Sequence, residues 1–190
     1  MKVNLQNKAR SLRENNYEIS DDIIYRWSPR QMTGEVVTLE ELKALVAAGS
    51  WAPSSRNNQP WHYYLATNTD EAFSDLLGSL NEGNRIWCKQ AGALLVLVSH
   101  TKAEYKNKDI PTHSFDTGAS WMAFAIEGVR RNLVVHAMAG FNKEIVRDFL
   151  EFDSNSVIEC MIAVGKPSED ISKDKVSVRR PLTESMTLLK

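Results

Sequence analysis

The feature that most constrains the fold is an unbroken apolar run at residues 93–98, with the sequence ALLVLV. A second run, CMIAV, occupies residues 160–164. Neither run alternates apolar and polar positions, so each predicts a short strand that is covered on both faces. Both runs are far too short to cross a bilayer as a helix, which needs about 20 apolar residues. The chain is therefore expected to bury a sheet inside its own core.

Helical periodicity dominates between the strands. The strongest pattern covers residues 116–131, where apolar side chains recur every three or four positions. Thr38 and Glu41 predict a capping box at the start of another helix, and Gly49 is expected to end that helix. The remaining predicted elements are helices over 70–80 and 143–150, the latter capped by Asn142, and a strand over 62–66. This order predicts an α+β fold.

The first residues are polar with a thin apolar face, which predicts an amphipathic helical arm. We expect this arm, residues 1–20, to precede a single domain over residues 21–190 and to pack on another subunit. No apolar leader segment is visible at the start, and the two cysteines stand far apart, so a cytoplasmic location is expected. A formal net charge of −1 argues against a nucleic-acid partner, and no membrane partner is expected.

Several common signatures are missing from the sequence. A glycine-rich dinucleotide loop, a phosphate-binding Walker loop, an H-E-x-x-H motif and a G-x-S-x-G elbow do not occur. The four histidines show no metal-ligand spacing, so no metal site is expected. These absences leave three polar segments as the candidates for a binding site.

The first segment is residues 26–30, where Arg26, Ser28 and Arg30 alternate and would point to one side of an extended stretch. Guanidinium groups bind phosphate bidentately, although a solvated basic patch is the plainer interpretation. The second segment, residues 52–61, places many side-chain donors between prolines and tryptophans, and could equally be a connector rich in turns. The third, residues 136–142, contains a glycine that permits close approach to a ligand, or simply ends a helix.

Taken together, the three segments resemble the motifs of the nitroreductase family. Residues 26–30 match its R-x-S-x-R element, and residues 52–61 match A-P-S-S-x-N-x-Q-P-W. The family's Asn-x-x-Trp pair corresponds to Asn84 and Trp87, and its closing basic residue before Pro-Leu corresponds to the Arg-Arg-Pro-Leu at 179–182. The resemblance spans about residues 22–185.

The resemblance implies an α+β fold with a central, mostly antiparallel sheet surrounded by helices, in an interlocked homodimer with FMN at the subunit interface. The implied cofactor-binding residues are Arg26, Trp27, Ser28, Arg30, Pro53, Ser54, Ser55, Asn57, Asn84, Ala137, Met138, Ala139, Gly140 and Arg179. The resemblance places the phosphate on Arg26, Ser28 and Arg179. It places Arg30 and Asn84 at the flavin pyrimidine.

By the same resemblance, residues 53–55 would come from the partner subunit, and a backbone N–H near residues 139–140 would face flavin N5. The chain departs from the family pattern at Ser177, where a lysine is usual, and at Trp87, where many relatives carry a second basic residue. Lys175 or Arg180 could replace the missing basic group. Asn132 stands where a glycine is usual, and Asn tolerates the left-handed conformation.

The function implied is transfer of hydride from NADH or NADPH, through FMN, to a nitroaromatic, a quinone or a similar small acceptor by a ping-pong mechanism. No catalytic side chain is expected, because the flavin carries the chemistry. Two alternatives remain open. One is a specialised flavin reaction such as reductive dehalogenation, and the other is a flavin-binding protein without turnover.

Overall fold

The computed structural model describes residues 4–13 and 17–189 and contains one four-stranded sheet in the order β1-β2-β4-β3. The strands are β1 (Trp61–Thr67), β2 (Ala93–His100), β3 (Val134–Met138) and β4 (Ser156–Gly165). Every neighbouring pair is antiparallel. The first apolar run forms most of the central strand β2, and the second forms half of its neighbour β4. This confirms the α+β expectation, and all residues of these runs except Cys160 are buried.

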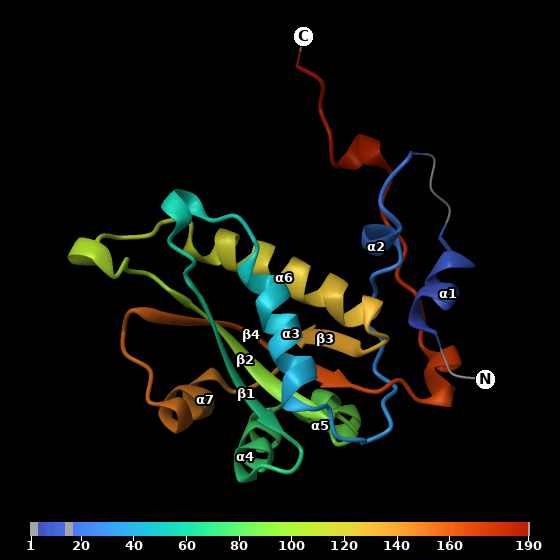
Figure 1. The fold of residues 1–190 in the computed structure, drawn as a ribbon, viewed down its shortest axis with the longest axis horizontal. Coiled ribbons are helices and arrows are strands. Elements are labelled where there is room, and N and C mark those ends of the chain that lie inside the picture. Colours follow the sequence, from blue (N-terminus) through green and yellow to red (C-terminus); the bar gives the residue numbers. More distant parts are fainter. Residues whose placement is uncertain (1–3, 14–16, 190) are drawn as a thin grey trace.

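Helices cover both faces of this sheet (Figure 1). The α-helices are α1 (Leu5–Arg10), α2 (Asp21–Ile24), α3 (Leu39–Ser50), α4 (Glu71–Ser79), α5 (Glu82–Cys88), α6 (His113–Arg130) and α7 (Lys143–Leu150). Helices α3 and α6 pack on one face, and α4, α5 and α7 pack on the other. None of the described helices is long and apolar enough to cross a membrane.

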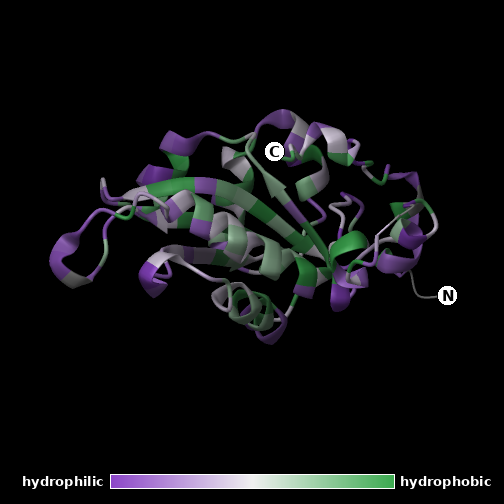
Figure 2. Cartoon of the chain, turned by 90° about the horizontal axis from the view of Figure 1, so that it is seen from above, coloured by the Kyte–Doolittle hydropathy of each residue, from purple (hydrophilic) through white to green (hydrophobic). Residues whose placement is uncertain are grey.

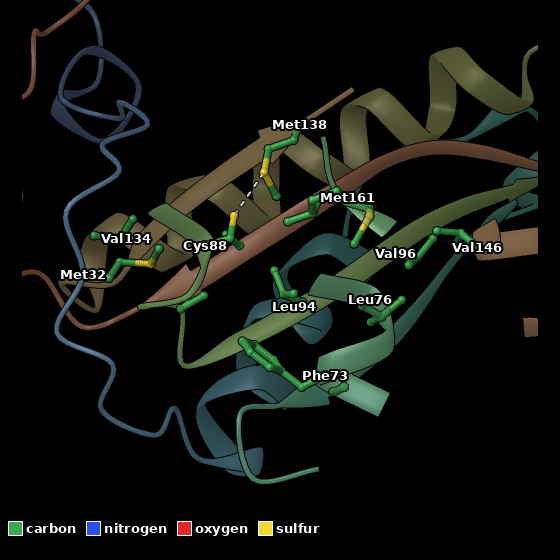
Figure 3. Packing of buried hydrophobic residues seen from close by; sticks show 14 of the residues in the cluster. Met32, Phe73, Leu76, Cys88, Leu94, Val96, Val134, Met138, Val146 and Met161 are labelled. Carbon is green, nitrogen blue, oxygen red and sulfur yellow. Dashed lines mark hydrogen bonds between the residues drawn. The ribbon is translucent and has the colours of Figure 1, made fainter. Parts of the chain in front are cut away.

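Alternate residues of β2 supply the two halves of the core. Leu94 and Val96 join the cluster beneath α4, α5 and α7, whereas Leu95 and Leu97 join the cluster beneath α3 and α6. Figure 3 shows the first cluster, and Figure 2 shows the hydrophobic strands between more hydrophilic outer elements. Burying one such side chain stabilises the fold by about 1.5–3 kcal/mol, so this strand alone is a major source of stability.

The predicted helix caps are largely confirmed. Thr38 and Glu41 form a reciprocal capping box at the start of α3. The Asn142 side chain accepts hydrogen bonds from two backbone N–H groups of α7. Gly49, however, does not end α3, which continues to Ser50. A Cβ at Gly49 would lie 2.9 Å from the Tyr63 hydroxyl, so this glycine permits close packing of α3 against the sheet and α6.

Among the elements missed in the sequence are a strand and a helix close to the site. Residues 134–138 form the edge strand β3, where we expected the end of a helix and a loop. This strand is short and contains a polar histidine, so only its pairing with β4 reveals it. Residues 82–88 form α5, which buries only Cys88 and therefore shows little apolar periodicity.

The N-terminal segment packs on its own chain. Leu5 and Ala9 of α1 are fully buried in the core, and the Trp27 indole donates to the Leu5 carbonyl over 3.0 Å. The expectation that these two residues cover another subunit is therefore wrong, because the same chain supplies their apolar surroundings. Residues 1–3 and 14–16 of the expected arm lie outside the described residues.

Candidate functional site

A cavity of about 960 Å³ lies where α2, the middle of α6, β3 and the C-terminal segment come together. In Figure 1, α2 and the C-terminal segment lie beside α1. Four arginines line this cavity: Arg13, Arg26, Arg179 and Arg180. Among the described residues that line it, none is an aspartate or a glutamate, and these residues carry an excess of positive charge. Apolar side chains from α2 and α6 complete the wall.

Arg26 and Ser28 form one side of the polar part. The Arg26 guanidinium donates to the Ser28 hydroxyl over 3.1 Å. Burial lowers the pKa of Arg26, and the nearby positive charge of Arg179 lowers it further. These two arginines lie together, and the described part of the lining places no carboxylate beside them, an arrangement that an anionic ligand would relieve.

Arg13 approaches the same place from the N-terminal segment and was missed in the sequence. Its guanidinium donates to the backbone carbonyls of Ile24 and Arg26, the latter over 2.9 Å. It also donates to the Ser177 carbonyl and hydroxyl over 3.1 and 3.3 Å. Burial and the charges of Arg179 and Arg26 lower the pKa of Arg13 to about 10.

His136 lies in the cavity wall on β3, next to Ala137. Its Nδ1 is 3.0 Å from the Pro29 carbonyl, which can only accept, so Nδ1 carries the proton. Burial lowers the pKa of this imidazole and favours the neutral form. The Trp87 ring packs against it with a centroid separation of 4.9 Å.

Arg30 does not join the other arginines. Its guanidinium lies 5.7 Å from the centroid of the Trp87 ring, outside the lining of the cavity. The alternation of Arg26, Ser28 and Arg30 therefore brings only the first two into the cavity. Trp27, which was expected beside the cofactor, is buried in the core and held by Leu5.

Asn84 and Gly140 contact each other. The Asn84 side-chain nitrogen donates to the Gly140 carbonyl over 3.1 Å, and the Asn81 backbone N–H donates to it over 3.0 Å. A Cβ at Gly140 would lie 2.3 Å from the Asn81 side-chain nitrogen, so a larger residue here would displace the Asn81 amide. The Asn84 nitrogen expected at a flavin edge instead holds this loop. Met138 is buried, 3.4 Å from the Cys88 sulfur (Figure 3).

The loop of residues 53–57 lies away from the cavity, at the N-terminal end of α6. The Ser55 backbone N–H donates to the buried Asp116 carboxylate over 3.0 Å. Asn57 lines a separate, smaller cavity of about 410 Å³, and its φ of 56° is left-handed. Within one chain, the predicted site residues thus fall into two separate regions, and contribution of this loop to a partner's site stays a prediction.

Comparisons with known proteins agree on one family. The family model described as the nitroreductase family matches residues 23–87. A conjugated linoleic acid (CLA) biosynthesis enone reductase from Lactiplantibacillus plantarum is 24% identical over 148 residues, which are 77% of this chain and 64% of that protein. An uncharacterised 15.4 kDa protein from Mycolicibacterium smegmatis is 35% identical over 79 residues, 42% of this chain and 52% of that protein. The matches thus span less than two thirds of either curated relative.

Solved structures extend the likeness over the whole fold. A crystal structure of an oxidoreductase containing FMN superposes with a TM-score of 0.85 and 31% identity, covering 92% of this chain and 93% of that one. A nitroreductase family protein from Streptococcus pneumoniae has a TM-score of 0.73 at 18% identity, covering 86% of this chain and 96% of that one, which shows the shared fold. This chain belongs to the nitroreductase family.

Proposed function

We propose that this protein binds FMN in the arginine-lined cavity and transfers hydride from NADH or NADPH to a small electron-poor acceptor. The observation that carries the proposal is the cavity itself, which joins an end lined by four arginines to an apolar wall. A phosphate ester attached to a flat aromatic ring has the matching charge and shape. The similar solved structure that contains FMN supports the same ligand.

The residues present fit this cofactor. Arg26, Ser28 and Arg179 would hold the phosphate, because guanidinium and hydroxyl donors pair with its oxygens. The backbone of residues 137–140 would lie along the ring, and the Asn84 amide fixes the Gly140 end of that segment. Bound FMN supplies the acceptance and release of a hydride, so the chain needs to bind, orient and shield rather than to react.

We propose that the active form is an interlocked homodimer. The 53–57 loop would then serve the partner's flavin, which explains why it lies away from the cavity of its own chain. The C-terminal segment exposes large apolar side chains that a partner would cover, with exposed fractions of 84% at Val178, 78% at Leu188 and 89% at Leu189. Trp51, beside the loop, is 89% exposed. An obligate interface of this kind buries roughly 2,000 Å² or more.

The acceptor class proposed is a nitroaromatic, a quinone or another conjugated electron-poor molecule. The enone reductase among the relatives adds α,β-unsaturated ketones to the compounds worth testing. If one cavity serves NAD(P)H and the acceptor in turn, the kinetics are ping-pong. Initial-rate plots at several acceptor concentrations should then give parallel lines, and converging lines would contradict this mechanism.

The deciding experiment is to purify the protein, denature it and identify the released flavin by chromatography. We expect a yellow protein that releases FMN rather than FAD. The same holoprotein, mixed anaerobically with NADH or NADPH, should bleach as the flavin is reduced. A colourless protein that takes up no added FMN would overturn the proposal. A yellow protein that neither cofactor reduces would leave the flavin-binding alternative in its place.

Light scattering of the holoprotein at micromolar concentration tests the dimer. A monomer that still holds FMN tightly would contradict it.

A further inference from the structure

Arg13 stands out because nothing in the recognised motifs includes it. It is not part of the R-x-S-x-R element or of the C-terminal basic pair, yet it lines the same cavity as Arg26 and Arg179. The guanidinium groups of Arg13, Arg26 and Arg179 repel one another in a cavity whose described lining residues include no carboxylate. Burial and this repulsion lower the pKa values of Arg13 and Arg26. A fold that retains such a cluster is poised for an anion.

The hydrogen bonds of Arg13 give it a second property. One terminal nitrogen holds the carbonyls of Ile24 and Arg26, and the other holds Ser177. These two segments carry the residues expected to bind phosphate, since Arg26 belongs to one and Arg179 stands two positions after Ser177. Arg13 therefore ties together two parts of the chain about 150 residues apart. Its Nε is buried and has no partner, which leaves one donor of this side chain unused.

We infer that Arg13 supplies the third positive charge of the phosphate subsite and positions Arg26 and Arg179 around it. The inference rests on the proposed FMN function and assigns it a further residue. The Arg13 guanidinium lies against Ser177, so the N-terminal segment provides the basic group that residue 177 itself lacks. Neither Lys175 nor Arg180 touches Ser177 in this way among the described contacts.

The competing interpretation is that Arg13 only holds segments of the chain together. Binding of FMN and of riboflavin distinguishes this structural role from a role in phosphate binding. Riboflavin has the same ring and ribityl chain but no phosphate. If Arg13 only docks the N-terminal segment, Arg13→Gln should weaken both flavins equally. If Arg13 binds the phosphate, Arg13→Gln should weaken the binding of FMN but not that of riboflavin.

The experiment uses the full chain with its flavin removed and follows flavin fluorescence during titration. For Arg13→Gln we expect the FMN Kd to rise about 10- to 100-fold, the usual effect of losing a charged hydrogen-bonding partner, and the riboflavin Kd to stay within about two-fold. Arg10→Gln is the matched control. Arg10 lies in the same segment, outside the cavity lining, where it pairs with Asp21 at 2.7 Å and stacks on Tyr25. The Kd values for FMN and for riboflavin should therefore both stay unchanged in this variant.

Equal weakening of both flavins, or no change in either, would overturn the role of Arg13 while leaving FMN binding by the wild type intact. If Arg13→Gln fails to fold, Arg13→Lys decides, because a lysine keeps the charge but cannot hold both segments. An FMN Kd within two-fold of wild type for that variant would overturn the positioning role. If the wild type binds no FMN, the proposed function fails. Thermal stabilisation by inorganic phosphate, present in the wild type and absent in Arg13→Gln, then still tests the anion subsite.

Discussion

Two polar clusters of this molecule differ in how their donors and acceptors are balanced. The cavity gathers the guanidinium groups of Arg13, Arg26 and Arg179, and the lining residues that the structure describes offer them no carboxylate. The other cluster joins Ser99 at the end of β2, His113 and Ser114 at the start of α6, and Glu159 on β4. There, Ser99 donates to the Glu159 carboxylate over 2.5 Å, and Ser114 donates to it over 2.6 Å.

The histidine completes this second cluster, since its Nδ1 lies 2.7 Å from the Ser99 hydroxyl. By residue type alone, a serine, a histidine and a glutamate in contact resemble a set of catalytic residues. Yet these groups satisfy one another, and such a network stabilises a fold without needing a ligand. The arginine cluster instead brings like charges together, which is the state that an anionic ligand corrects. Whether the polar groups satisfy one another, rather than which residue types are present, therefore distinguishes a structural cluster from a candidate binding site.

The largest effect is expected from emptying the cationic cluster. The double variant Arg26→Gln, Arg179→Gln removes two charged phosphate partners, so the FMN Kd should rise by on the order of 10³-fold, with riboflavin little affected. The same variant without flavin should unfold at an unchanged or higher temperature, because like-charge repulsion is relieved. Titration with each flavin and thermal unfolding measure both effects.

Arg85→Gln, an exposed position on α5, is the control for removing an arginine elsewhere. Loss of stability in the flavin-free double variant would mean that the arginines are structural and would break the contrast between the clusters.

A smaller effect is expected from the balanced cluster. Glu159→Ala removes the carboxylate that accepts hydrogen bonds from the fully buried Ser99 hydroxyl and from Ser114, so the free energy of unfolding should fall by about 1–3 kcal/mol. The FMN Kd should not change. Glu35→Ala, at an exposed position outside both clusters, should stay within about 0.5 kcal/mol of wild type. Denaturant unfolding measures the stabilities. A variant of normal stability that binds FMN poorly would show that the second cluster belongs to the site.

The sequence could predict those elements of the fold whose signals are local. The central strands and α3, α4, α6 and α7 follow from apolar patterns and caps, because those signals are local. Asn132 was correctly expected to tolerate a left-handed backbone, and its φ is 57°. Strand β3 was missed because its formation depends on pairing with β4, which is a tertiary contact.

The site followed the same rule. Arg26, Ser28, Ala137 and Arg179 were predicted by motif and do line one cavity. Arg13 was missed because its importance depends on contacts with Ile24, Arg26 and Ser177, and spacing along the chain cannot show them. Arg30 was expected with Arg26, but its side chain turns to Trp87 instead. Alternate side chains point to the same side only along a regular strand, so the sequence pattern alone could not predict the direction of the Arg30 side chain.

The smallest effect concerns pH and the cavity histidine. Burial lowers the pKa of His136 below the ordinary 6.5, the nearby Arg30 charge lowers it further, and the Pro29 hydrogen bond and Asp174 oppose the shift. Between the lowered pKa and 6.5 the unfolded chain binds a proton that the native chain does not. The stability that His136 contributes is therefore present above pH 6.5 and is lost as the pH falls below it.

Thermal unfolding of the flavin-free protein, measured from about pH 7.5 down to about pH 5.5, should thus show a decline in Tm that is shallower in His136→Gln. A decline remains in that variant because burial and the charge of His100 also lower the pKa of His62. Bound FMN should flatten the wild-type decline, since a phosphate near His136 favours the protonated imidazole. Identical declines in the wild type and His136→Gln would show that this histidine does not titrate in the cavity.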